Sequence, residues 1–165
     1  MSAVRERVRR TIRRHALCPP GSRVLVGLSG GSDSVALTFL LRDLAPALDF
    51  TLAGVAHVNH HLRDTADRDE AFCRALAERL GLAILVEDVH VQPLAQEKGL
   101  SLEDAARRAR YAALERVAGQ LGASRVAVGH TIDDQAETFV LKLVRGAGAA
   151  GLGGIYPLRG RVVRP

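Results

Sequence analysis

Short apolar runs rich in β-branched residues alternate with longer helical segments through most of the chain, and this alternation limits the folds open to it. Strands that alternate with helices are joined by right-handed crossovers and pair in parallel. The pattern therefore predicts an α/β fold, a doubly wound, mostly parallel sheet flanked by helices. The expected strands span residues 23–28, 50–58, 82–89 and 125–129, and the expected helices span residues 35–44, 67–80, 101–121 and 133–144.

A basic amphipathic helix is expected before the first strand. Val4, Val8 and Ile12 recur every four residues among arginines, which predicts a helix with one apolar stripe over residues 4–15. We therefore divide the chain into an N-terminal basic helix with its linker, residues 1–22, and one domain, residues 23–165. With 165 residues and 47% hydrophobic content, the chain has enough apolar side chains for a sizeable core.

The first expected strand runs directly into a loop that opens a helix, and the loop consists of Ser29, Gly30, Gly31, Ser32, Asp33 and Ser34. Backbone N–H groups, hydroxyls and a helix N-terminus around one turn form an anion site, and glycine lets the backbone approach a phosphate closely. Asp33 would repel a phosphate unless a cation lay between them, so the sequence predicts bound Mg²⁺. The alternative is an ordinary turn in which Asp33 or Ser34 caps the helix.

Two other nucleotide-binding patterns do not fit the chain. The G-x-x-x-x-G-K-[ST] loop of γ-phosphoryl transfer is absent from the sequence. A formal G-x-G-x-x-G occurs at residues 146–151, but it follows an expected helix rather than a strand, so the context for dinucleotide binding is missing.

The loop at residues 29–34 resembles the PP-loop of the ATP pyrophosphatase superfamily, whose adenine nucleotide alpha hydrolase-like members cleave ATP between the α- and β-phosphates. Together with residues 57–63, 101–111 and 129–138, it is similar in order and spacing to the tRNA(Ile)-lysidine synthetase family. That resemblance implies a ligase that uses ATP and Mg²⁺. Its substrates would be free L-lysine and the wobble cytidine in the anticodon region of isoleucine tRNA, and an adenylated base would be the intermediate.

The resembling segments follow expected parallel strands or lie on the helix beside them, where open α/β sheets bind ligands. The resemblance implies a reaction centre that contains Asp33, Arg107, Arg110, Asp133, Asp134 and Glu137. The residues expected to bind the nucleotide are the six loop residues with His57, Arg63, Gly129 and His130. We expect Asp33 and Asp134 to bind Mg²⁺.

Alternative roles remain open for the charged residues of this set. Asp133 and Asp134 open an expected helix, where carboxylates also stabilise the N-terminus. Arg107 and Arg110 are three residues apart on one helix face, so both could bind one anion. A solvated basic face would give the same spacing.

The histidines and cysteines give no pattern of a metal or disulfide site. His57, His60 and His61 could be mistaken for zinc ligands, but no cysteine or carboxylate has the spacing to join them. Cys18 and Cys73 are too few and too far apart for a disulfide framework, which favours a reducing compartment, the cytoplasm. Because no stretch approaches the ~18 apolar residues of a membrane span, we expect no membrane contact.

The net charge of +5 is concentrated near the two ends of the chain, which suits a polyanion such as tRNA, although basic faces are often only solvated. Relatives in the resembling family commonly continue beyond the catalytic domain, so we expect the C-terminal tRNA-binding regions to be missing here. The sequence leaves a homodimer open.

The alternative functions are another PP-loop adenylating enzyme, such as a tRNA thiolase or an amide-forming synthetase, and a non-catalytic ATP-binding module. The absence of C-x-x-C argues against a thiolase.

Overall fold

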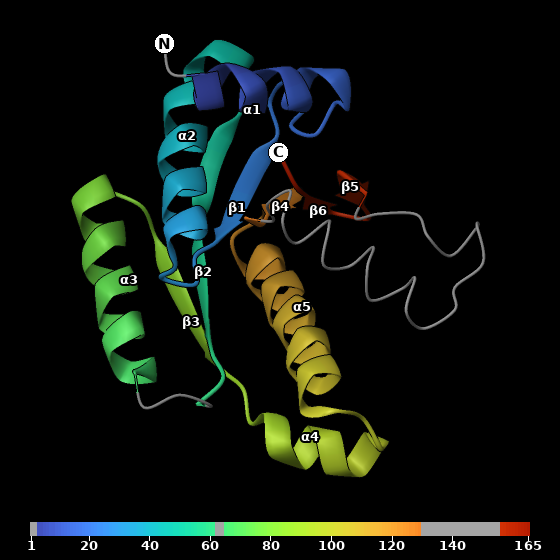
Figure 1. Ribbon diagram of the computed structural model, residues 1–165. Coiled ribbons are helices and arrows are strands. Elements are labelled where there is room, and N and C mark those ends of the chain that lie inside the picture. Colours follow the sequence, from blue (N-terminus) through green and yellow to red (C-terminus); the bar gives the residue numbers. More distant parts are fainter. Residues whose placement is uncertain (1–2, 62–64, 130–155) are drawn as a thin grey trace.

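A computed structural model describes residues 3–61, 65–129 and 156–165, and within them one six-stranded sheet has the strand order β3-β2-β1-β4-β6-β5 (Figure 1). The helices are α1 (Ala3–Arg14), α2 (Ser32–Leu48), α3 (Ala66–Leu80), α4 (Val91–Lys98) and α5 (Leu102–Gln120). The strands are β1 (Arg23–Gly27), β2 (Thr51–Asn59), β3 (Ile84–Asp88), β4 (Arg125–Ala127), β5 (Leu158–Arg159) and β6 (Val162–Val163).

Five of the strands are parallel, and only β5, at one edge, pairs antiparallel with its neighbour β6. The chain moves from β1 outward to β2 and β3, and then returns through α5 to place β4 on the other side of β1. The predicted doubly wound, mostly parallel sheet is therefore confirmed. The order reverses beside β1, and open α/β sheets bind ligands beyond the carboxyl ends of the strands at such a point.

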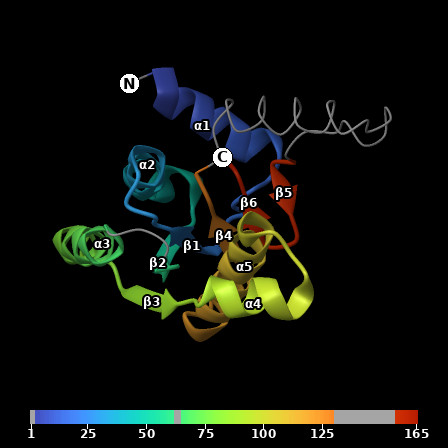
Figure 2. The same cartoon turned by 60° about the horizontal axis from the view of Figure 1, so that its bottom comes forward.

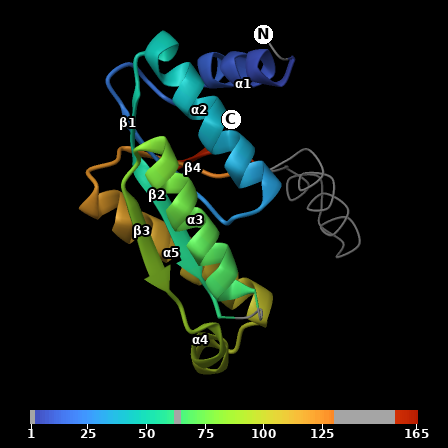
Figure 3. The same cartoon turned by 90° about the vertical axis from the view of Figure 1, so that its left-hand side faces the viewer.

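Helices cover both faces of the sheet. Val24 and Val26 of β1 pack into one core cluster with side chains of α1, α2 and α3, whereas Leu25 packs into a second cluster with α5. All three side chains are fully buried, which explains why β1 reads as a continuous apolar run rather than an alternating one. Figure 2 shows α5 and α2 on opposite sides of the sheet, and Figure 3 shows α2 and α3 side by side in front of it.

The observed helices agree with the expected ones in order but differ in extent. α2 is longer than predicted, because it begins inside the glycine-serine loop and continues through Pro46 in its last turn. Ser101 caps α5: its Oγ accepts a hydrogen bond of 3.1 Å from the Asp104 N–H. The predicted helix at residues 133–144 lies outside the described residues.

The sequence did not predict α4 or the β5–β6 hairpin. α4 contains Pro93, but in its first turn, where a missing N–H costs no helical hydrogen bond. The two strands of the hairpin span two residues each, too short for a periodic pattern to appear. Within the described ranges, no helix combines the length and apolar character needed to cross a membrane.

Candidate functional site

Hydrogen bonds from its own side chains fix the conformation of the loop between β1 and α2. The Ser34 hydroxyl donates to the Gly31 carbonyl at 2.9 Å and accepts from the Ser29 N–H at 3.1 Å, while the Ser29 hydroxyl lies 3.1 Å away. Gly30 has φ +87°, a conformation that favours glycine. The turn is thereby closed through Ser34, which is buried, while Gly31 is exposed.

The N-terminus of α2 is free to receive an anion. Gly31 occupies the N-cap position and no side chain caps the helix, so the alternative in which Asp33 or Ser34 is the N-cap residue is wrong. The first N–H groups of a helix have no intrahelical acceptor, and they carry the positive end of the helix dipole. Asp33, in the first turn, is exposed to solvent beside them.

The entry to the loop is fixed from the neighbouring strand and helix. His57 is buried in β2, and its Nδ1 lies 2.9 Å from the Leu28 carbonyl oxygen, to which it donates in the tautomer protonated at Nδ1. The Cys73 thiol of α3 donates to the same oxygen at 3.5 Å. Burial and the negative charges of Asp69 and Glu70 raise the pKa of Cys73 to about 11, so it stays a protonated donor.

His57 thus positions the loop through Leu28, and its predicted role as a nucleotide ligand stays a prediction. Cys73 and Asp69 were not recognised from the sequence, although they lie four residues apart on one face of α3. A Cβ atom added to Gly30 would lie 3.6 Å from both the Asp69 Cβ and the Cys73 Sγ. Asp69 therefore lies beside the loop, and its carboxylate accepts a hydrogen bond of 3.2 Å from the Thr65 hydroxyl.

Gly129, after β4, closes the site from the other side. A Cβ atom added there would lie 3.2 Å from the backbone C and O of Asp33 and from the backbone N of Ser34. The end of β4 therefore approaches the first turn of α2 at a distance that only glycine permits without displacement. Gly129 therefore lies beside the loop, and its predicted role in nucleotide binding stays a prediction.

Gly129→Ala should weaken ATP binding, because the added methyl group must push the first turn of α2 away from the loop. We expect the Kd for ATP with Mg²⁺, measured by isothermal titration calorimetry, to rise about tenfold, since overpacking costs about 1–3 kcal/mol. Gly119→Ala is the matched control, because nothing lies within 4 Å of a Cβ atom at that position in α5. Equal affinities for the two variants would contradict the prediction.

His60 directly follows β2, and Arg110 of α5 is close enough for its charge to act on it. Burial lowers the pKa of His60, and the positive charges of Arg110, His57 and His61 lower it further. Its buried Nδ1 has no hydrogen-bond partner in the described part of the chain. Among the described residues no group of three or more histidines, cysteines or acids could hold a metal ion, so the zinc alternative for the histidines finds no support there.

Because the pKa of His60 is lowered by folding, the unfolded chain binds more protons than the folded chain below the ordinary histidine pKa of about 6.5. The free energy of unfolding should therefore fall as the pH drops from 7 to 5. Urea unfolding of the wild type and His60→Asn across this range measures the effect, with the wild type losing stability relative to the variant. A constant difference between the two proteins would show that His60 is not responsible.

Arg107 and Arg110 have different neighbours. The Arg107 guanidinium carbon lies 5.7 Å from the centroid of the Tyr111 ring, in a cleft between α5 and the β5–β6 hairpin. Arg110 lies near His60 instead, and its positive charge lowers the pKa of that histidine. Both remain candidates for the reaction centre. The predicted site residues Arg63, His130, Asp133, Asp134 and Glu137 lie outside the described residues.

The glycine-serine loop at the reversal of strand order is similar to a loop of known proteins. The sequence model of the family described as the PP-loop domain matches residues 3–165. The chain belongs to this PP-loop domain family. The resemblance seen in the loop at residues 29–34 is therefore confirmed, and the glycine-serine turn and the α2 N-terminus are its PP-loop.

Curated relatives extend the similarity beyond the PP-loop. A tRNA(Ile)-lysidine synthase of Dehalococcoides mccartyi is 43% identical over 96% of this chain and 34% of its own length. One from Geobacter sulfurreducens is 46% identical over 100% of this chain and 35% of its own length. A third, from Thermus thermophilus, is 45% identical over 88% of this chain and 27% of its own length. The chain thus spans about a third of the length of these relatives.

A solved structure shares the same PP-loop fold. A U34-tRNA thiolase from Methanococcus maripaludis, solved with its [4Fe-4S] cluster, matches with a TM-score of 0.76 over 97% of this chain and 56% of that chain. The two sequences are only 21% identical, so the likeness concerns the fold alone.

Proposed function

We propose that this PP-loop chain carries the ATP-dependent part of a tRNA(Ile)-lysidine synthetase, a ligase that joins free L-lysine to the wobble cytidine of isoleucine tRNA in the cytoplasm. The observation that carries the proposal is the glycine-serine turn of residues 29–34, held by the Ser29 and Ser34 hydroxyls, at the N-terminus of α2, where the N-cap residue is Gly31 and makes no side-chain capping bond. The lysidine synthases 35–46% identical to most of this chain support the choice of substrates.

The turn is suited to the outer two phosphates of ATP. N–H donors at a helix N-terminus bind phosphate oxygens, and they need no reorganisation as charge develops on the departing pyrophosphate. Asp33, exposed beside those donors, fits Mg²⁺, which binds one or two carboxylates together with substrate phosphates. Bound there, the ion would neutralise phosphate charge, and Asp134 is the second ligand we assign to it.

The reaction we assign has two steps. The carbonyl oxygen of the cytosine ring attacks the α-phosphorus of ATP, the bond to the bridging oxygen breaks, and pyrophosphate leaves against the loop N–H groups. The ε-amine of lysine then attacks the activated ring carbon and displaces AMP, and the proton lost by the amine passes to Asp134 or a neighbouring carboxylate. Arg107 and Arg110 are the groups we assign to the negative charge on the phosphate.

A tRNA thiolase is the alternative function, and the properties of the two cysteines argue against it. The chain has two cysteines, and both are buried: Cys18 in the connection between α1 and β1, and Cys73 on α3. Burial is the main cause that raises the pKa of each thiol to about 11. Reactive cysteines have lowered pKa values and partial exposure, so these two thiols do not suit sulfur transfer.

Pyrophosphate release tests the proposed function. The purified chain is incubated with ATP and Mg²⁺, with lysine and isoleucine tRNA each added or left out, and released pyrophosphate is measured. Release that needs both lysine and tRNA supports the ligase. ATP binding without release under every condition would leave only the non-catalytic module, and release that needs neither substrate would contradict the assignment. Size-exclusion chromatography of the same sample tests for a homodimer.

A further inference from the structure

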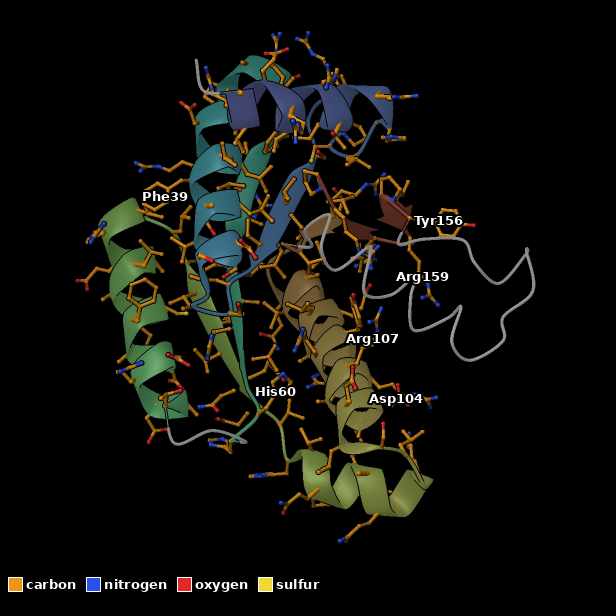
Figure 4. The ribbon with its side chains drawn as sticks, in the orientation of Figure 1. Phe39, His60, Asp104, Arg107, Tyr156 and Arg159 are labelled. Atoms are coloured by element: carbon orange, nitrogen blue, oxygen red, sulfur yellow. The ribbon has the colours of Figure 1, made fainter. Side chains whose placement is uncertain are left out.

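A basic cleft of about 510 Å³ lies between α5 and the β5–β6 hairpin, at the carboxyl edge of the sheet that also carries the PP-loop. β6 runs parallel to β4, so Arg164, which follows β6, lies at that edge. The lining residues are Asp104, Arg107, Arg108, Tyr111, Glu115, Arg159, Val162 and Arg164. Figure 4 shows Arg159 and Tyr156 on the hairpin side of the cleft and Arg107 and Asp104 along α5.

The charges of the cleft select an anion. Of the described residues, four guanidinium groups line it against two carboxylates, and one of these, Glu115, already lies 4.0 Å from the guanidinium of Arg161. Among the described residues neither Arg108 nor Arg159 forms an ion pair, and both side chains are exposed. An ammonium group such as that of lysine would be repelled, whereas phosphate oxygens would meet several N–H donors.

Arg164 fixes both walls of the cleft from inside. Only 9% of its surface is exposed, and its guanidinium donates to the Tyr156 carbonyl at 2.9 Å and to the Tyr111 hydroxyl at 3.1 Å. Arg107 lies over the Tyr111 ring, and Arg164 connects Tyr111 of α5 to the backbone at Tyr156. Its buried Nε has no hydrogen-bond partner among the described atoms.

Tyr156 stands beside this cleft as an exposed aromatic ring on a fixed backbone. Its exposed fraction is 67%, the highest among the large hydrophobic side chains of the described residues. Arginines that follow a phosphate backbone next to an aromatic ring on which a base can stack are the usual means of binding single-stranded nucleic acid. A duplex keeps its bases stacked on one another, so it could not use the ring.

We propose that the cleft binds a single-stranded RNA segment, with phosphates on Arg108 and Arg159 and one base stacked on Tyr156. The inference rests on the proposed function, because the segment would be the part of the substrate RNA that flanks the reacting base at the PP-loop. The other basic surface, on α1, is lined by Arg9, Arg10, Arg13, Arg14 and Glu6. It lacks an aromatic ring, and Glu6 pairs with Arg9 at 2.9 Å. The cleft is therefore the better match to RNA.

The test measures binding of a fluorescein-labelled RNA hairpin, whose loop carries the isoleucine anticodon sequence, by fluorescence anisotropy. Tyr156→Ala should weaken binding about tenfold, and Tyr156→Phe, which keeps the aromatic face, should bind within about twofold of wild type. Arg159→Ala should weaken binding and reduce the slope of log K against log salt by about 1, as the loss of one phosphate contact predicts. Arg42→Ala, an exposed arginine on α2, is the charge-matched control and should have a smaller effect than Arg159→Ala.

Separate outcomes test the two claims. Equal affinities for Tyr156→Ala and wild type, equal binding of the hairpin and of a blunt RNA duplex, or no binding of the hairpin by wild-type chain would each overturn the RNA cleft. Binding of ATP by the same variants is measured in parallel and should be unchanged, since neither Tyr156 nor Arg159 belongs to the PP-loop. If the wild-type chain does not bind ATP, the proposed function is overturned instead.

Discussion

Asp33→Asn is expected to reduce Mg²⁺-dependent pyrophosphate release by about a thousandfold, equivalent to about 4 kcal/mol of transition-state stabilisation. Asp33 is the exposed carboxylate in the first turn of α2, beside the N–H groups assigned to the phosphates. The amide has nearly the same shape but no charge, so the variant should lose the metal ion while the loop and the helix stay intact. A coupled assay for pyrophosphate, with Mg²⁺ titrated from micromolar to millimolar, measures the loss.

Asp67→Asn is the matched control for this experiment. Asp67 is an exposed carboxylate in the first turn of α3, so its replacement removes the same charge at an equivalent place in a neighbouring helix. The control should keep turnover within about twofold of wild type, as surface substitutions commonly do. Unaltered turnover of Asp33→Asn, or an equal loss in both variants, would remove Asp33 from the metal site. Thermal unfolding of both variants excludes a folding defect.

Gly54→Ala is expected to lower the free energy of unfolding by about 4 kcal/mol. The β1–β2 pairing shifts by one residue between Val24 and Leu25, and Gly54 lies opposite Leu25 with φ +150°. An added Cβ atom would lie 2.6 Å from the Ala83 carbonyl oxygen and 3.0 Å from the Leu121 Cδ1. The backbone contact cannot be relieved by a rotamer change, so β2 would have to move away from the chain that enters β3.

Gly119→Ala serves again as the control, because the position is helical and nothing surrounds it within 4 Å. Alanine there should raise the free energy of unfolding by about 0.5–1 kcal/mol, since glycine loses more backbone entropy in a helix. Urea unfolding of both variants gives the two differences directly. A loss below about 1 kcal/mol for Gly54→Ala would contradict the close approach at the shifted pairing.

The local features of the fold could be predicted because each is encoded within a few consecutive residues. The apolar run at residues 23–28 depends on neighbours in sequence, and the strand expected there forms as β1. α4 could not be predicted, because the segment is short and contains Pro93, and its packing comes from α5. The β5–β6 hairpin is stabilised by pairing with β4, which a reading of residues 158–163 alone cannot reveal.

The sequence by itself determined that this chain is an alternating α/β unit with a PP-loop at residues 29–34, because strand and helix periodicity and the loop composition are short-range properties. Tertiary structure alone decided which distant groups meet there. It brought His57 and Cys73 to the Leu28 carbonyl and Gly129 to the first turn of α2. It likewise joined Arg164 to Tyr111 across 53 residues. These contacts depend on strand order and register, which are set by burial of the whole sheet rather than by any local pattern.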